Sequence, residues 1–255
     1  MLKIIDDNFN LHVTLVPEQV PGMQVNRLAG LVYVDSGLSC DTFNIIHITD
    51  SRLFSEQDFR TAIAHFKNKN FAYCTWINQE NLTAEVQDIF QRMNIVEQNT
   101  EEGMILDLSK YGIVDNPLHA NIHLAKTKEH IKDFAEVIAL NWTPPDENIR
   151  KYFSLTADTY LTGQQEIMMA VYYQDNQPVS VIELFGPGKE TIGLYSLATR
   201  STYRGKGIGT AVMTIALNLA KNRGYKNVIL QASEDGIGIY TKLGFRVITK
   251  FYEYA

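Results

Sequence analysis

The 255-residue chain has only two cysteines, Cys40 and Cys74, and they do not form a Cys-x-x-Cys motif. This low count argues against a disulfide framework and against a cysteine-based zinc site. No apolar run is long enough to span a bilayer. The first residues lack the long apolar region and the small-residue cleavage site of a signal peptide. We therefore expect a cytoplasmic protein with no membrane partner.

An excess of positive charge is also missing. The formal net charge is −6, from 23 Lys and Arg residues and 29 Asp and Glu residues. From Ile122 onward the chain has 15 basic and 13 acidic residues, whereas before Ile122 it has 8 and 16. A mildly acidic chain without a basic face is a poor candidate for binding nucleic acid. We therefore expect a small-molecule or protein substrate.

A strand, a turn and a helix are predicted between residues 192 and 224. The strand, Ile192 to Thr199, is rich in β-branched and apolar residues, and apolar residues at helical spacing follow from Ala211 to Ala220. Glycines ahead of a helix expose backbone N–H groups, and the helix dipole favours an anion there. The sequence therefore predicts a phosphate or pyrophosphate loop. Its basic and glycine residues are Arg204, Gly205, Lys206, Gly207 and Gly209.

Three kinds of anion loop can be compared with this turn. A Walker-type loop needs Ser or Thr after Gly-Lys, where Gly207 stands here, and a dinucleotide fingerprint needs a glycine where Thr210 stands. The pattern Arg/Gln-x-x-Gly-x-Gly/Ala is met by Arg204, Gly207 and Gly209. On these residues the sequence resembles the GNAT superfamily of N-acetyltransferases. The resemblance implies that the loop holds the pyrophosphate of acetyl-coenzyme A (acetyl-CoA).

A second signature lies downstream. Residues 231–245 contain Tyr240-x-x-Leu-Gly-Phe at the end of a predicted strand and short helix, which is similar to the second GNAT signature. The predicted element order of residues 122–255 is βααβββαβαβ, the inventory of a GNAT domain. We therefore expect an α/β (α+β) fold, with a catalytic GNAT domain at 122–255 in which helices flank a mixed central sheet.

The first half is predicted to be a separate domain, residues 1–115, with a linker near residues 111–120. Its helix, strand, helix, strand order from Ser55 to Leu108 repeats the order from Ile208 to Tyr252. This repetition predicts a partial, degenerate GNAT-like domain, and an unrelated accessory domain is the alternative. The segment before its helix has no glycine and carries two acids, so we expect no cofactor loop in this half.

The resemblance implies acetyl-CoA as cosubstrate and no metal. In a GNAT domain the central strand separates from the next one, and the pantetheine arm lies in the gap. Ser233 stands where the family often has an asparagine near the pantetheine. The cofactor-binding residues that the resemblance implies are Leu197, Ala198, Thr199, Arg204, Gly205, Lys206, Gly207, Ile208, Gly209, Thr210, Ser233 and Tyr240.

The resemblance also implies direct attack of a neutral amine on the thioester. The backbone N–H of Leu197 would polarise the carbonyl oxygen, and Tyr240 would act as general acid toward the departing thiolate. A phenol with a pKa of about 10 can protonate a thiolate with a pKa of about 8.5. Glu183 is a candidate base, with water as the alternative. The structural alternatives are a packing role for Tyr240 and an exposed strand position for Glu183.

These observations predict an N-acetyltransferase that moves an acetyl group from acetyl-CoA to a primary amine of a small molecule or a protein. The alternative is a non-catalytic module that binds acyl-CoA or recognises a partner. A third interpretation is an unrelated nucleotide-binding protein whose loop holds ATP or NAD. Both a monomer and a homodimer are compatible with the sequence.

Overall fold

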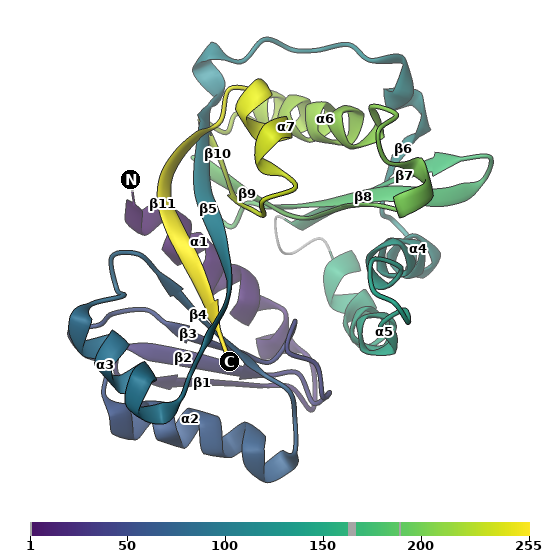
Figure 1. Ribbon diagram of the computed structural model, residues 1–255. Coiled ribbons are helices and arrows are strands. Elements are labelled where there is room, and N and C mark those ends of the chain that lie inside the picture. Colours follow the sequence, from purple (N-terminus) through teal and green to yellow (C-terminus); the bar gives the residue numbers. More distant parts are fainter. Residues whose placement is uncertain (1, 163–166, 189) are drawn as a thin grey trace. The chain divides into compact units, whose positions relative to one another are not determined.

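The computed structural model describes residues 2–162, 167–188 and 190–255. The chain forms two compact units, and Figure 1 shows their elements. Unit 1 comprises Met1–Met104, Gln231–Gly238 and Val247–Ala255. Unit 2 comprises Ile105–Leu230 and Ile239–Arg246. No helix in the described ranges is both long and apolar enough to cross a membrane.

Unit 1 is a sheet with helices packed on it. Its strands lie in the order β1-β2-β3-β4-β11-β5. Pairs β1–β2, β2–β3 and β4–β11 are antiparallel, and β3–β4 is parallel. The elements are α1 (Leu2–Leu15), η1 (Pro17–Gln19), β1 (Gln24–Leu28), β2 (Leu31–Asp35), β3 (Ile45–Ile48), α2 (Glu56–Lys69), β4 (Cys74–Asn78), α3 (Ala84–Met93), β5 (Glu97–Asp107) and β11 (Arg246–Tyr254).

The last strand belongs to the first unit, which differs from the predicted division of the chain. The prediction placed all of residues 122–255 in one domain, but β11 pairs with β4, with Tyr252 opposite Ile77. Tyr254 is buried there, 4.6 Å from the ring of Phe90 on α3. Burial of these apolar side chains explains why the strand is part of the unit 1 core.

A side chain caps the N-terminus of α2 in unit 1. Ser55 Oγ accepts the N–H of Asp58 at 3.1 Å and donates to the carboxylate of Asp58 at 2.8 Å. The preceding turn lies on Gly30, whose carbonyl accepts the N–H groups of Thr49 and Asp50 at 2.9 and 3.2 Å. At the start of α2, the Ser55 side chain therefore accepts a backbone N–H that a bound anion would otherwise use. That this half has no cofactor loop stays a prediction.

The strands of unit 2 lie in the order β10-β9-β8-β7-β6. β10 and β9 are parallel, and the other neighbouring pairs are antiparallel. The predicted α/β fold with a mixed sheet is confirmed. The elements are η2 (Leu108–Lys110), η3 (Pro117–Asn121), β6 (Ile122–Leu124), α4 (Lys128–Ala139), α5 (Glu147–Leu161), β7 (Ile167–Gln174), β8 (Gln177–Phe185), β9 (Thr191–Thr199), η4 (Ser201–Tyr203), α6 (Ile208–Asn222), β10 (Asn227–Ala232) and α7 (Ile237–Lys242).

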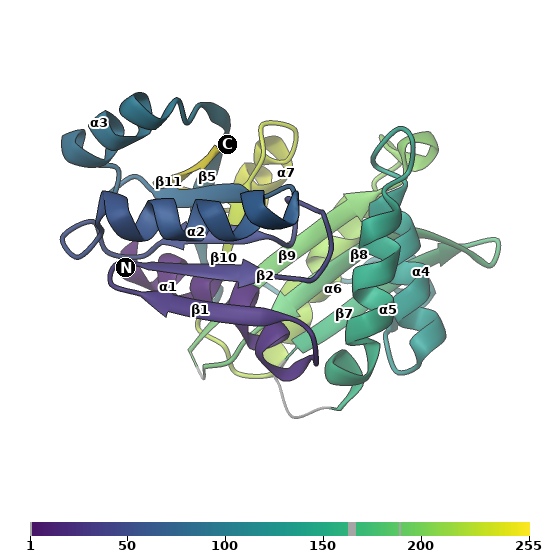
Figure 2. The same cartoon turned by 90° about the horizontal axis from the view of Figure 1, so that it is seen from below.

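Helices cover both faces of the unit 2 sheet. Figures 1 and 2 show α6 on one face and the antiparallel pair α4 and α5 on the other. β8 runs through the middle and is buried from Val179 to Phe185, because a strand with helices on both faces exposes neither set of side chains. Phe134 of α4 and Phe153 of α5 pack in the core with ring centroids 5.3 Å apart.

The predicted linker is not a free connection. Asn218 of α6 donates to the carbonyl of Val114 at 2.8 Å, and its side-chain oxygen accepts the hydroxyl of Tyr111 at 3.2 Å. Lys221 donates to the carbonyl of Leu108 at 3.0 Å. These contacts attach residues 108–114 to the side of α6, so this segment is part of unit 2.

Gly30→Ala is expected to destabilise the protein much more than Gly22→Ala. Both glycines have positive φ, +76° and +91°, so alanine adds about 1–2 kcal/mol of backbone strain at either position. A Cβ at Gly30 would also lie 2.4 Å from the amide nitrogen of Phe54, whereas a Cβ at Gly22 meets nothing within 4 Å. We expect Gly30→Ala to lower the free energy of unfolding by about 1–3 kcal/mol more. Urea denaturation measures it, and equal losses would contradict the close packing of this turn.

Candidate functional site

Strand β9 carries a bulge in the middle of unit 2. Glu183 of β8 lies opposite Tyr195, but Val181 lies opposite Ala198, so the two residues Ser196 and Leu197 face one residue of β8. Ser196 has a φ of +55°, a left-handed conformation that is uncommon outside glycine. A bulge leaves its extra residue outside the regular ladder and bends the strand. The predicted oxyanion donor, the N–H of Leu197, therefore lies at the irregular point of β9.

The strand becomes accessible beyond this bulge. From Thr191 to Leu194 it pairs in parallel with Asn227–Leu230 of β10, and these four residues of β9 are buried. From Tyr195 to Thr199 every residue is partly or fully exposed. The predicted pantetheine contacts, Leu197 to Thr199, thus belong to the open end of β9, where a ligand can reach the backbone.

The glycine loop follows β9 after the short turn η4. Gly205 and Gly207 both have positive φ, +74° and +78°, and Gly207 is the N-cap of α6. No side chain caps this helix, and its first described backbone bond runs from the N–H of Ala211 to the carbonyl of Gly207 at 3.0 Å. A helix supplies no internal acceptor for its first four N–H groups, here those of Gly207 to Thr210. A Cβ at Gly207 would meet nothing within 4 Å, so the loop is open on the side where that Cβ would point.

The start of α6 lies between the end of β9 and helix α7. A Cβ built on Gly209 would be 3.6 Å from Thr199 Oγ1 and 3.9 Å from the side chain of Ile239, the neighbour of Tyr240. The structure therefore brings together the strand end, the glycine loop and the helix of the predicted acid. These three segments are separate in the sequence.

Polar side chains fix the end of β9. The buried Ser180 Oγ of β8 donates to the carbonyl of Ala198 at 2.8 Å and lies 2.8 Å from Thr199 Oγ1. Arg204 donates through Nε to the carbonyl of Thr199 at 3.0 Å and through Nη2 to Asn141 Oδ1 at 2.7 Å. A guanidinium has five N–H donors, so these two bonds hold Arg204 beside the loop and leave donors for an anion.

Further positive charge lies at the loop. Lys206 Nζ is 5.0 Å from the ring centroid of Tyr203, and the Arg200 guanidinium is 6.0 Å from the same ring. Contact with the face of one aromatic ring gathers both cations next to the exposed glycines. In the described part of the chain, no cluster of three or more His, Cys, Asp or Glu side chains could hold a metal ion.

Tyr240 is a buried residue of α7, with 8% of its surface exposed, and its ring packs at 62° on Phe245, with 5.9 Å between centroids. The carbonyl of Tyr240 accepts the N–H of Phe245 at 3.0 Å, which closes the end of the short helix.

Ser233 belongs to unit 1. It is exposed, and its carbonyl accepts the N–H groups of Gly236 and Ile237. The roles of Tyr240 and Ser233 in binding or catalysis stay predictions.

Glu183 is not an exposed strand residue, because only 2% of its surface is accessible. Burial first, and then the negative charge of Glu183, raise the pKa of Tyr152 and Tyr160 of α5 well above the ordinary phenol value. The side chains of these two tyrosines also share a hydrogen bond. Neither tyrosine could be singled out from the sequence, because apolar and aromatic positions on a helix predict only a core face.

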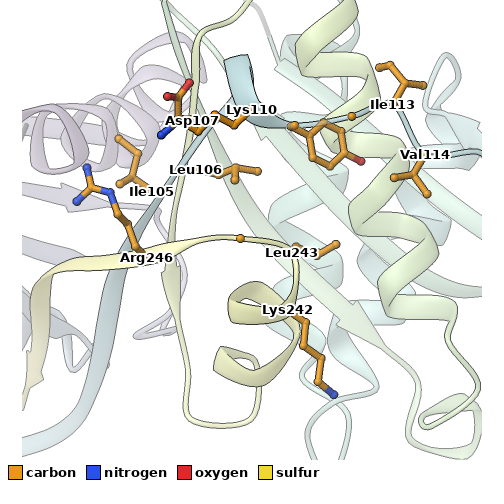
Figure 3. A pocket seen from close by; sticks show the side chains of 12 residues that line it. Ile105, Leu106, Asp107, Lys110, Ile113, Val114, Lys242, Leu243 and Arg246 are labelled. Carbon is orange, nitrogen blue, oxygen red and sulfur yellow. The ribbon is translucent and has the colours of Figure 1, made fainter.

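A hollow of unit 2 lies elsewhere. It has a volume of about 570 Å³, and Figure 3 shows both apolar and charged side chains in its lining. Among its lining residues are Leu106, Tyr111, Ile113, Val114 and Leu243. In the same view Lys242 extends away from the other side chains. No residue of the hollow belongs to the glycine loop or to β9, so the candidate site is the open strand end and not this cavity.

Comparison with protein families gives one match in the region of this site. Residues 133–245 match the model of the Acetyltransferase (GNAT) family. Probable N-acetyltransferase 14 of Xenopus tropicalis is 29% identical over 112 residues, which are 42% of this chain and 51% of that protein. N-acetyltransferase 8B of Rattus norvegicus is 32% identical over 68 residues, 26% of this chain and 31% of that protein. The chain thus spans about half or less of the length of these relatives.

Solved structures resemble the chain over both units. A GCN5-related N-acetyltransferase from Kribbella flavida covers 97% of this chain and 94% of its own, with a TM-score of 0.69 and 11% identity. A tandem GNAT protein from the clavulanic acid biosynthesis pathway covers 95% and 86%, with a TM-score of 0.61 and 12% identity. At these identities the likeness establishes the fold, including that of the first half.

Proposed function

We propose that this chain, a member of the GNAT superfamily of N-acetyltransferases, moves an acetyl group from acetyl-CoA to a primary amine by direct attack. The observation that carries this proposal is the uncapped, glycine-initiated start of α6 beside the open end of β9. Membership of this family sets aside the interpretation of an unrelated protein that binds ATP or NAD. The cytoplasmic location stays a prediction.

The residues at the loop fit a pyrophosphate. The N–H groups of Gly207 to Thr210 have no partner within the helix, and the dipole of α6 makes this end positive. Arg204 and Lys206 add two formal charges at the same place, and the open space at Gly207 leaves room for the anion. We infer that this loop holds the diphosphate of acetyl-CoA and that the backbone of Leu197 to Thr199 pairs with the pantetheine amides.

Three groups would then act on the reaction. The N–H of Leu197 would donate to the thioester carbonyl oxygen at the bulge, where charge develops during attack. The hydroxyl of Tyr240 would supply the proton that the departing sulfur needs. Glu183 is the candidate base, but its burial keeps it from touching an acceptor directly. The acceptor, a small amine or a protein amine, is not specified by these groups.

Gly209→Val is expected to weaken acetyl-CoA binding while the protein stays folded. The new side chain would stand between the first turn of α6, Thr199 and Ile239, where the proposal places the cofactor. The Cβ itself makes only ordinary contacts at 3.6 and 3.9 Å. We expect a loss of affinity of at least about tenfold, or 1.4 kcal/mol, by isothermal titration calorimetry.

Gly112→Val is the matched control, because its Cβ meets nothing within 4 Å and it lies outside the loop. Circular dichroism would show that both variants are folded. If Gly209→Val binds acetyl-CoA as tightly as the control, the loop does not hold the cofactor and the proposed function fails. Gly207→Val would also block the site, but its positive φ adds backbone strain.

Tyr240→Phe is expected to lower kcat by about 10²–10⁴-fold, the range for loss of a general acid. A panel of amines with acetyl-CoA, followed by release of free thiol, measures this rate. Tyr225→Phe serves as control, because that buried hydroxyl donates to the carbonyl of Gly186 at 2.9 Å and has no proposed part in transfer. Tight binding of acetyl-CoA without turnover of any amine would favour the non-catalytic alternative, and an unchanged kcat in Tyr240→Phe would leave the tyrosine a packing role.

A further inference from the structure

Arg204, the first residue of the glycine pattern, is held by a residue that the pattern does not contain. Its Nη2 donates to Oδ1 of Asn141, 63 residues earlier in the chain, at 2.7 Å. Its Nε donates to the carbonyl of Thr199 at 3.0 Å. Arg204 is exposed, and a long exposed side chain loses rotamer freedom when it is fixed in one geometry. Two acceptors that fix this guanidinium beside an anion site therefore point to a role in binding.

The end of helix α4 fixes the position of Asn141. Val137 and Ala139, in the last turn of α4, are fully buried. Asn141 Nδ2 donates to the carbonyl of Val137 at 2.9 Å and to that of Ile138 at 3.3 Å. The backbone N–H of Asn141 also donates to the carbonyl of Ile138, at 3.0 Å. A helix leaves its last carbonyls without internal partners, and Asn141 satisfies two of them, so its side chain is attached to a packed helix.

Only one orientation of the Asn141 amide fits these contacts. A guanidinium can only donate hydrogen bonds, and a backbone carbonyl can only accept them. The Nδ2 atom must therefore face the two carbonyls of α4, and Oδ1 must face Arg204. A carboxylate of the same size would place an oxygen against these carbonyls, and alanine would contact neither group. The amide is thus suited to connect the end of α4 with the arginine.

The other donors of Arg204 are available to an anion. A guanidinium has five N–H groups in one plane, and the two bonds use one on Nε and one on Nη2. Both N–H groups of Nη1 and the second one of Nη2 are left. Because the two acceptors fix the plane, these donors keep one direction before any ligand arrives. A preorganised donor loses less conformational entropy on binding, and charge-assisted hydrogen bonds to a phosphate are strong.

We propose that Asn141 is a positioning residue for the donor substrate, which holds the guanidinium of Arg204 in the orientation that binds the diphosphate of acetyl-CoA. This inference rests on the acetyl-CoA site proposed above. Asn141 acts through Arg204 and not by contact with the diphosphate. Helix α4, which lies outside both glycine-containing signatures, thereby takes part in donor binding. The alternative is that Asn141 only completes the end of α4, in which case Arg204 would bind the diphosphate equally well without it.

The test is a double-mutant cycle in which isothermal titration calorimetry measures the affinity for acetyl-CoA. We expect Asn141→Ala to weaken binding by about three- to tenfold and Arg204→Ala by about tenfold or more. The double variant should bind no more weakly than Arg204→Ala alone, because Asn141 then has no arginine to hold.

A second donor separates positioning from a structural role. S-acetylpantetheine keeps the thioester and the pantetheine amides and lacks the diphosphate. Its kcat/KM, measured with the amine that the wild-type chain acetylates fastest in a panel, should be unchanged in Asn141→Ala. With acetyl-CoA, the same variant should have a raised KM and an unchanged kcat.

Thr162→Ala is the matched control, because Thr162 follows the end of α5 and its hydroxyl donates to the carbonyl of Thr159 at 3.0 Å. It should leave both donors unaffected. A loss with both donors in Asn141→Ala, or a further loss when it is added to Arg204→Ala, would show a structural role and overturn the inference while acetyl transfer stands. Unchanged affinity for acetyl-CoA in either single variant would do the same. If no amine is acetylated, acetyl transfer fails and the calorimetric cycle alone decides the role of Asn141. A wild-type chain that does not bind acetyl-CoA would overturn both proposals.

Discussion

The function inferred here depends on backbone N–H groups at the start of α6 that the chain leaves without partners. A helix cannot satisfy its own first donors, and most proteins supply a capping side chain. Gly207 supplies none, and its positive φ is a backbone conformation that glycine adopts without strain. Because the same turn follows the bulged end of β9, the anion site and the accessible strand backbone are adjacent. An anionic thioester could therefore be held at both ends.

The first unit has the same strand–helix–strand topology, but the start of its helix α2 is capped by a side chain. Its parallel strands β3 and β4 are joined by α2, as β9 and β10 are joined by α6. At α2, however, Ser55 and Asp58 pair with each other and with the backbone, and the turn before them packs closely on Gly30. The solved tandem GNAT structure covers both units, so the difference between the helix starts is one of side-chain chemistry on a shared fold. The capped start of α2 supports the prediction that the first unit has no anion site at this helix.

Local signals predicted the parts of the site that depend on backbone geometry. The spacing of Arg204, Gly207 and Gly209 specifies an uncapped helix start, and the structure has one. Features that depend on contacts between segments far apart in the sequence could not be predicted. Glu183 was predicted as a candidate base, with an exposed strand position as the alternative, and its burial could not be read from the sequence because it depends on tertiary packing. Likewise, the membership of β11 in unit 1 depends on pairing across more than 170 residues, which no local pattern encodes.

The most direct test of the central claim is to follow the backbone amides by NMR during titration with acetyl-CoA. The account predicts large shifts of the amide signals of Ile208, Gly209 and Thr210, together with those of Leu197 to Thr199. It predicts no such change at the capped start of α2, around Asp58. Shifts confined to other amides, or saturation of binding without any change at residues 208–210, would contradict the account.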